Sequence, residues 1–376
     1  MSVHIGLPSE VSSILRRLTL AGHSAYAVGG CVRDRLMGRV PSDYDITTSA
    51  LPEQTQELFS DCRLVLSGLK HGTVGVIVGG SVYEVTTFRT DGSYGDGRRP
   101  DSVSFTSDIS DDLARRDFTV NAIAYSPELG LVDPFDGYGD IKRGIIRTVG
   151  DPLRRFSEDG LRILRLARFC STLGFEPEEA SLSAAKELKH MLKKVAAERI
   201  SEEYIKLVCG ENADRAFLLC RDILSSVLPG LYPTVPLKDR SDSKAVRLAL
   251  CGGTKGLKVS NDLKKRVDLL LSAEPPQNDR ISARRFLSVY GADMLEDIFA
   301  CFRARGVSDA DGLEKLCNRV LAEGDCISLS ELAVKGDELP TSGAETGILL
   351  KKMLDAVIDG RIENTKEELL TKGLNL

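Results

Sequence analysis

The spacing of hydrophobic residues changes near Asp151 and divides the chain into two unlike parts. Before Asp151, short apolar runs typical of β-strands alternate with stretches of helical spacing. The predicted strands cover residues 25–28, 43–47, 73–78, 81–88, 131–135 and 145–149, and the predicted helices cover 11–20, 32–37, 52–59 and 111–124. Gly79 and Gly80 separate two of the strands and predict a hairpin. The glycine-rich, charged residues 89–102 predict a loop.

After Asp151 the strand signals almost disappear, and apolar residues recur at helical spacing. Helices are predicted at 154–173, 182–195, 201–209, 215–223, 349–359 and 365–370. The proline-bearing residues 228–240 predict a linker. A small head of mixed strands and helices, followed by an all-helical remainder, is an α+β architecture.

Composition limits the classes of protein that fit this pattern. The 376 residues are 42% hydrophobic, which is enough for several compact cores. No apolar run reaches the roughly 20 residues of a membrane helix, and no charged-then-apolar leader follows Met1, so we expect a cytoplasmic protein with no membrane partner. The nine cysteines form no Cys-x-x-Cys pair, which argues against a zinc site or a disulfide framework. The net charge of −5 does not by itself suggest a nucleic-acid partner, but such binding follows local charge. Basic residues do cluster locally, at 98–99, 115–116, 154–155, 162–168 and 186–194.

The chemistry-bearing residues begin with a glycine pair. Gly29 and Gly30 follow the strand at 25–28, and Arg33 lies just beyond them. Glycines let a backbone approach a phosphate closely. Asp43 and Asp45 then occupy alternate positions of the next predicted strand and point to the same face, where they can share a cation. Each part alone is typical of a turn or a solvated strand edge, but together they predict a magnesium–nucleotide site.

Further motifs follow in a characteristic order, at residues 70–74, 115–122, 158–162 and 198–206. With these motifs the chain resembles the bacterial class II tRNA nucleotidyltransferases (CCA-adding enzymes) and their poly(A) polymerase relatives in the DNA polymerase β superfamily. The resemblance implies a polymerase-β-like head at 1–150, a helical neck at 151–212, a helical body at 213–276 and a helical, tRNA-binding tail at 277–376. It also implies the tRNA acceptor arm, CTP and ATP as partners, with no DNA, and Mg²⁺ as the cofactor, used in a two-ion mechanism.

The resemblance assigns roles to individual residues of the head. Asp43 and Asp45 would be the metal ligands, and Glu84 would be a third catalytic carboxylate; Glu84 is otherwise a charged residue on the open face of a strand. The groups implied to bind the nucleotide's phosphates and sugar are Gly29, Gly30, Arg33, Arg116, Asp117 and Asn121. For Asp117, capping of a helix is an alternative explanation.

Asp159 and Arg162 are three residues apart, so a continuous helix would present both on one face. The resemblance implies that this pair selects the base. Cytosine and adenine each offer an amine donor beside a ring-nitrogen acceptor, which a carboxylate and a guanidinium match, whereas uracil and guanine reverse both groups. Arg165 and Arg168 continue the series and resemble nucleotide-contacting or supporting positions. A surface salt bridge is the alternative for the pair, and contact with phosphate or RNA is the alternative for Arg165 and Arg168.

The sequence leaves several functions open. Residues 91–101 resemble the flexible loop of full CCA-adding enzymes, which disfavours a CC-adding or A-adding specialist. His71-Gly72-Thr73 lacks the arginine-rich sequence that poly(A) polymerases carry there, which disfavours that activity. Intact Asp43 and Asp45 disfavour a catalytically silent RNA-binding protein. We therefore predict template-independent addition of CCA to tRNA from CTP and ATP, with release of pyrophosphate.

Overall fold

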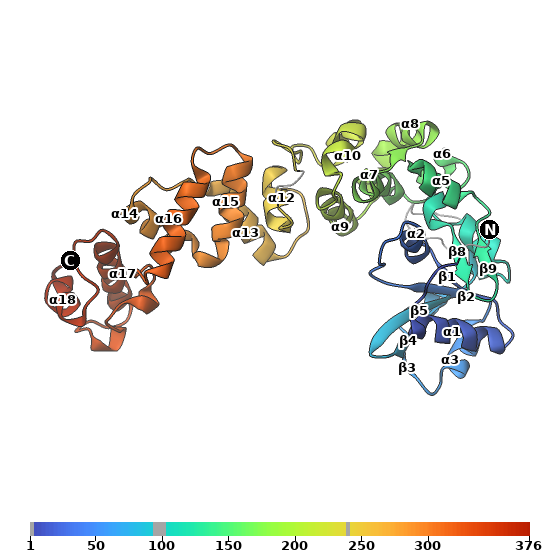
Figure 1. The fold of residues 1–376 in the computed structure, drawn as a ribbon, viewed down its shortest axis with the longest axis horizontal. Helices are drawn as coiled ribbons and strands as arrows, with labels where there is room; N and C mark the ends of the chain where they lie inside the picture. Colours follow the sequence, from blue (N-terminus) through green and yellow to red (C-terminus); the bar gives the residue numbers. More distant parts are fainter. Residues whose placement is uncertain (1–3, 93–102, 238–240) are drawn as a thin grey trace. The chain divides into compact units, whose positions relative to one another are not determined.

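The computed structural model describes residues 4–92, 103–237 and 241–376. The chain folds as two compact units, Met1–Gly230 and Leu231–Leu376. Figure 1 shows that strands are confined to the first unit, among the described residues, while the second is built from helices. The predicted α+β fold, with a mixed-sheet head and a helical remainder, is thus confirmed.

The head is organised around a seven-stranded sheet with the order β3-β4-β5-β2-β1-β8-β9. β2 and β5 are parallel, and every other neighbouring pair is antiparallel. The strands are β1 (Ala25–Val28), β2 (Asp45–Thr48), β3 (Arg63–Val65), β4 (Thr73–Val78), β5 (Ser81–Thr87), β8 (Ala124–Ser126) and β9 (Gly130–Val132). The hairpin predicted at Gly79-Gly80 is present and joins β4 to β5. Both glycines adopt the positive φ that a tight turn requires.

The helices of the head are α1 (Ser9–Leu20), α2 (Gly30–Leu36), α3 (Pro52–Leu58), α4 (Ile109–Ala114) and α5 (Gly137–Arg143). α1 and α3 lie side by side against the sheet in Figure 1. α1 buries Val11, Ile14, Leu15 and Leu18, the apolar stripe that helical spacing predicts. A second apolar cluster includes Val28, Phe88 and Leu113, and Val28 directly precedes the glycine pair.

Two sequence predictions in the head are wrong. Arg89–Asp91 is not loop but strand β6, which pairs with β7 (Val103–Phe105); the rest of the predicted loop, 93–102, lies outside the described residues. The helix predicted at 111–124 ends at Ala114, and Thr119–Asn121 forms a separate 3₁₀ turn. The apolar spacing continues through this break because the side chains of Phe118, Val120 and Ile123 are buried in the core, although the backbone that carries them is not an α-helix.

The first unit continues as a group of packed helices. They are α6 (Pro152–Glu158), α7 (Leu161–Leu173), α8 (Glu179–Glu187), α9 (Ala197–Val208), α10 (Ala213–Leu219) and α11 (Arg221–Val227), with the 3₁₀ segment Leu188–Lys194 after α8. A short parallel ladder joins β10 (Ile145–Ile146) to β11 (Glu176–Pro177). Asp151 caps α6, whose first residue is Pro152, by accepting a bond of 2.7 Å from the backbone N–H of Arg154.

The single helix predicted at 154–173 is in fact two, α6 and α7, separated at Asp159 and Gly160. A Cβ at Gly160 would lie 2.9 Å from the carbonyl oxygen of Met191, so only glycine permits this close packing. The break lies at Asp159, whose backbone is extended (φ −143°, ψ 106°), and the apolar spacing does not reveal it.

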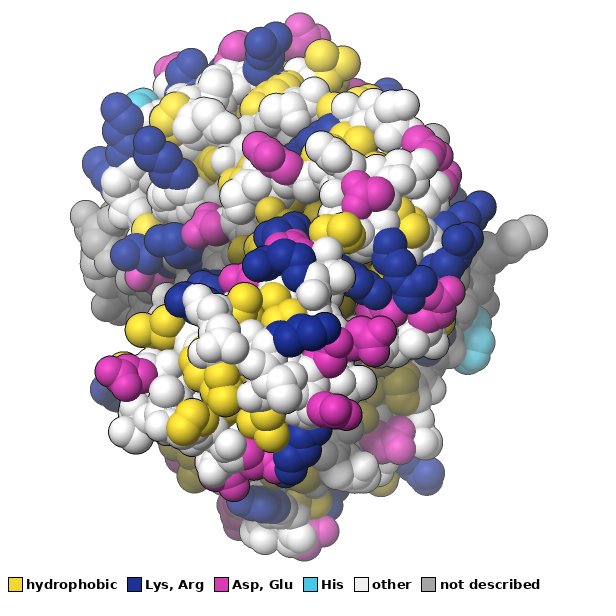
Figure 2. All heavy atoms as spheres, turned by 90° about the vertical axis from the view of Figure 1, so that its left-hand side faces the viewer, with side chains coloured by type: hydrophobic (Ala, Val, Ile, Leu, Met, Phe, Trp, Pro, Cys, Tyr) yellow, Lys and Arg dark blue, Asp and Glu magenta, His cyan; other side chains and the backbone are white. Residues whose placement is uncertain are grey.

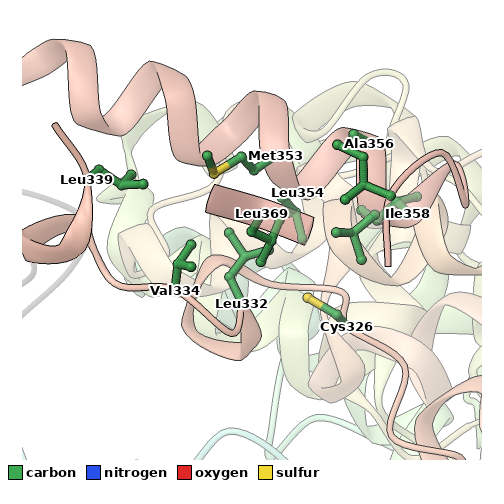
Figure 3. Close-up of a cluster of buried hydrophobic side chains, with 11 residues drawn as sticks. Cys326, Leu332, Val334, Leu339, Met353, Leu354, Ala356, Ile358 and Leu369 are labelled. Atoms are coloured by element: carbon green, nitrogen blue, oxygen red, sulfur yellow. The ribbon is translucent and has the colours of Figure 1, made fainter. Parts of the chain in front are cut away.

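The second unit contains α12 (Lys244–Leu250), α13 (Asn261–Ser272), α14 (Arg280–Tyr290), α15 (Leu295–Ala304), α16 (Ala310–Ala322), α17 (Ala344–Ile358) and α18 (Lys366–Thr371). Figure 3 shows the core near its end, where Met353 and Leu354 of α17 pack with Leu332 and with Leu369 of α18. Met353 and Leu369 are fully buried. In the part of the chain that the structure describes, no helix is long and apolar enough to cross a bilayer.

Candidate active site

The two predicted metal-binding aspartates lie at the start of β2. In register across the sheet, Asp45 pairs with Val28 of β1, and Ile46 pairs with Val85 of β5, which places Glu84 beside Asp45. Asp43 precedes the strand rather than belonging to it, so the expectation that both aspartates project from one strand is wrong. Asp43, Asp45 and Glu84 nevertheless line the same pocket, of about 510 Å³.

The charges around Asp45 suit a cation. Burial raises the pKa of its carboxyl group, the positive charge of Arg116 lowers it, and the negative charges of Asp43 and Glu84 raise it further. A divalent cation between these carboxylates would remove their mutual repulsion. No three His, Cys, Asp or Glu side chains are gathered as a ready-made metal cage among the described residues.

The glycine pair forms a tight turn between β1 and α2. Gly29 has φ +79°, and its N–H donates to the carbonyl oxygen of Ile123 at 3.0 Å. Gly30 is the first residue of α2. A Cβ on Gly29 would lie 2.9 Å from Nη1 of Arg116, so the absence of a side chain lets this guanidinium approach the turn. The turn and Arg116 therefore form one cationic corner next to Asp45.

Arg33 and Asn121 meet in the interior of the head. The Arg33 side chain donates to Oδ1 of Asn121 at 2.6 Å and to Oδ1 of Asp34 at 2.8 Å. Only 8% of Arg33 is exposed, and its guanidinium lies 5.4 Å from the ring of Phe169. The amide group of Asn121 in turn donates to Asp117 at 3.2 Å. These residues connect the glycine turn to the Arg116–Asp117 motif.

The Arg115–Asp117 motif follows the end of α4 instead of opening a helix. Its two arginines are held by Asp112, which is fully buried: Arg115 donates to Oδ1 at 2.8 Å, and Arg116 donates to Oδ2 at 3.3 Å. Burial acts to raise the pKa of Asp112, but the two guanidinium groups outweigh it and keep that pKa below its ordinary value. Asp112 was not among the predicted site residues, although its spacing of three and four from the arginines is a usable signal.

Asp117 lies at the head of a buried ionic chain. Its Oδ2 accepts from Arg165 at 2.7 Å. Arg165 also contacts Glu203 at 3.2 Å, and Glu203 accepts from Arg168 at 3.0 Å. Burial alone would raise the pKa of Asp117, yet the charge of Arg165 and the bonds from Asn121 and Arg165 hold it well below its ordinary value. These ion pairs connect the Arg115–Asp117 motif of the head to α7 and α9.

The two residues of the predicted base-reading pair hold different partners in the structure. Asp159 lies in the break before α7, and its carboxylate contacts Arg199 at 2.8 Å and the N–H of Leu161 at 3.0 Å. Arg162, on α7, donates to Glu158 at 2.8 Å. The premise that one helix carries Asp159 and Arg162 is therefore wrong. The partners Glu158 and Arg199 belong to motifs that the sequence showed, but their pairing across the helices was not predicted.

Two family models match parts of the chain. A family model described as the poly A polymerase head domain matches residues 25–147, and one described as a probable RNA and SrmB-binding site of polymerase A matches residues 174–232. The carboxylate site and the head-domain match define a nucleotidyltransferase. The curated CCA-adding enzyme of Lactobacillus delbrueckii subsp. bulgaricus is 36% identical over 389 residues, covering 95% of each chain. The chain belongs to the CCA-adding enzyme family.

Two further similarities extend the comparison. The CCA-adding enzyme of Geobacillus stearothermophilus is 37% identical over 392 residues, covering 96% of this chain and 95% of its own. The crystal structure of the Bacillus stearothermophilus CCA-adding enzyme in complex with CTP shares 33% identity and a TM-score of 0.83, covering 97% of this chain and 96% of the other. These findings confirm the resemblance that the motif order predicted.

Proposed function

We propose that this enzyme adds CCA to the 3′ end of tRNA from CTP and ATP and releases pyrophosphate. The observation that carries the proposal is the near full-length similarity to CCA-adding enzymes, combined with carboxylates that face one pocket beside a glycine turn. A silent RNA-binding protein would have no need to keep Asp43, Asp45 and Glu84 at a shared pocket.

In this proposal the 3′-hydroxyl of the RNA attacks the α-phosphate of the nucleotide, and the bond to pyrophosphate breaks. Asp43 and Asp45 would hold Mg²⁺, with Glu84 as a third carboxylate; when bound, the metal lowers the pKa of the hydroxyl and neutralises charge on the departing pyrophosphate. Arg116 offers positive charge to the phosphates, which would lie against the Gly29–Gly30 turn. Asp112 keeps Arg116 in place for this contact.

Base selection is proposed to rest on Asp159 and Arg162. Arg199 orients the Asp159 carboxylate, and a carboxylate has enough lone pairs to accept a base amine as well. Glu158 fixes the guanidinium of Arg162 in the same way. Uracil or guanine would set a carbonyl against the carboxylate, and such unpaired polar groups cost about 1–3 kcal/mol each. Arg165 and Arg168 then act as supports, held by Asp117 and Glu203.

RNA contact is proposed to be local. Most of the arginines in the sequence clusters of the first unit are held by carboxylates, as Arg115 and Arg165 show. By contrast Lys186 on α8 and Lys193 and Lys194 in the segment after it are exposed and suit phosphate contacts. On the face drawn in Figure 2, acidic and basic side chains are interspersed. The domain boundaries after residues 150, 212 and 276, the cytoplasmic location and the use of two Mg²⁺ ions remain predictions.

The proposal is tested with purified protein, Mg²⁺ and three tRNA transcripts that lack the terminal CCA, CA or A. Each nucleoside triphosphate is supplied singly, and then CTP with ATP. Sequential C, C and A addition that stops is expected. Addition that ends after CC, or addition of A alone, would identify a specialist, and unlimited A addition would identify a poly(A) polymerase. No incorporation at all would favour the RNA-binding alternative, and Asp45→Asn serves as the inactive control.

A further inference from the structure

Two arginines from neighbouring helices bind the C-terminal end of α4. The last carbonyl groups of a helix have no hydrogen-bond partner within that helix. Here Nη2 of Arg155, on α6, donates to the carbonyl oxygen of Ala114 at 2.9 Å. Nη2 of Arg162, on α7, donates to the carbonyl oxygen of Arg115 at 3.0 Å. The two arginine side chains are only 13% and 10% exposed, so α6 and α7 hold the backbone just before Arg116 through contacts that are largely shielded from water.

Arg155 connects this helix end to further groups. Its Nε donates to the carbonyl oxygen of Val149 at 3.1 Å, and its Nη1 donates to Oε2 of Glu158 at 2.9 Å. Arg162 donates to the same Oε2 at 2.8 Å and to the carbonyl oxygen of Arg155 at 3.0 Å. One carboxylate oxygen therefore joins the two arginines, and Arg155 links the end of α4 to the segment that leads into α6.

A nucleotide in the proposed site would span the two ends of this arrangement, with its base at Arg162 and its phosphates at Arg116. The base can influence the reaction at the α-phosphate only if these two groups keep a fixed separation. A displacement of about 1 Å at reacting atoms can cost roughly a hundredfold in rate. Asp112 holds Arg116 from within α4, at 3.3 Å. The bonds of Arg155 fix the end of that helix with respect to Arg162.

We propose that Arg155 is a positioning residue for nucleotide selection, because it holds the backbone that leads to Arg116 at a fixed distance from Arg162. The inference rests on the proposed function, since it assumes that Arg162 reads the base. With this connection intact, a matched base brings the α-phosphate into line with the attacking hydroxyl. A mismatched base does not reach that alignment, so selection acts on kcat as well as on binding. Arg155 acts through its neighbours and takes no part in bond making.

The test is the ratio of kcat/KM for CTP to kcat/KM for UTP, measured with saturating transcript that lacks CCA, in wild type and Arg155→Lys. Lysine keeps the positive charge but lacks the planar fork that serves several acceptors. The ratio is expected to fall about tenfold, the effect of losing one charged hydrogen bond. The fall should come mainly from a lower kcat for CTP, with its KM little changed. A smaller folded fraction alone would lower both kcat values equally and leave the ratio unchanged.

Arg154→Lys is the matched control. Arg154 precedes Arg155, donates to the carboxylate of Glu158 at 3.2 Å and is 79% exposed. Among the described residues, its side chain makes no bond to α4. Arg154→Lys is expected to keep the wild-type ratio within about twofold, because exposed ion pairs contribute little. Equal ratios in Arg154→Lys and Arg155→Lys would overturn the proposal.

A second measurement needs no turnover. Hydrogen–deuterium exchange of peptides that cover residues 113–119 is followed by mass spectrometry in wild type and both variants, without substrate. The N–H of Arg116 donates to the carbonyl oxygen of Leu113 at 3.2 Å, and local opening exposes it to exchange. Faster exchange is expected in Arg155→Lys than in Arg154→Lys, and equal exchange would overturn the positioning role. A wild type that incorporates no CTP would refute the proposed function, whereas this comparison reports on Arg155 in either case.

Discussion

Glu203 offers the sharpest test of the ionic chain that joins the head to α7 and α9. Its carboxylate is 6% exposed and lies between two guanidinium groups, Arg165 at 3.2 Å and Arg168 at 3.0 Å. Burial lowers the pKa of Arg168, and the adjacent positive charge of Arg165 lowers it further. The substitution Glu203→Gln keeps the shape of the side chain but removes the negative charge that offsets this repulsion.

The expected cost follows from what each arginine retains. Removing one partner of a buried ion pair typically costs about 3–5 kcal/mol, because the remaining charge is left uncompensated. Arg165 keeps its contact with Asp117 and is 28% exposed, so the lower end of that range applies, about 3 kcal/mol. For a unit the size of Met1–Gly230, each kcal/mol lowers Tm by roughly 2–4 °C, which gives a fall of about 6–12 °C.

The assay is thermal unfolding followed by circular dichroism, with Glu202→Gln as the matched control. Glu202 is the preceding residue on α9 and is exposed, so the same chemical change should shift the unfolding free energy by less than about 0.5 kcal/mol. A Tm for Glu203→Gln within about 2 °C of the Glu202→Gln value would refute the reasoning. It would mean that the two arginines find other compensation once the carboxylate is neutral.

Three other predictions concern the site. Gly29→Ala and Gly22→Ala both force a left-handed φ on alanine, but only the Cβ at Gly29 reaches Arg116. We expect similar losses of Tm in the two variants and a raised KM for CTP in Gly29→Ala alone. Equal KM values for CTP in the two variants would contradict this. Asp117→Asn should lower Tm at pH 7. The difference in Tm between Asp117→Asn and wild type should shrink as pH falls below about 4, because a carboxylate whose pKa is lowered by folding loses its stabilising effect as it becomes protonated. A Tm difference that does not change with pH would contradict the stated cause. Asp159→Ala should incorporate UTP and GTP at least tenfold faster relative to CTP while its Mg²⁺ dependence is kept, and continued rejection of both would end the base-reading proposal.

Much of the head was predictable because its signals are local. The β4–β5 hairpin follows from two apolar runs separated by Gly79-Gly80, and α3 follows from Pro52 at its start. Two carboxylates one residue apart next to a glycine turn were sufficient to suggest the metal site. The nucleotide-binding roles of the individual side chains stay predictions, although several of these side chains are in contact.

The missed features depend on contacts between distant segments. Gly160 packs closely against the backbone of Met191, and the partner of Asp159 is Arg199, forty residues later. The polar, irregular stretch after α4 has helical apolar spacing because Phe118 and Val120 fill a core from a non-helical backbone. No periodicity within a segment reports on a partner outside it, so such pairings come only from the fold.

The position of β1 in the sheet has a consequence for synthesis of the chain. β1 precedes the other described strands in the sequence, yet it becomes an inner strand, with β2 on one edge and β8 on the other. The edge that receives β8 stays open until Ala124 has been translated, and open strand edges promote association between chains. A nascent chain that ends before β8 would therefore expose the free edge of β1 in a sheet that lacks β8 and β9.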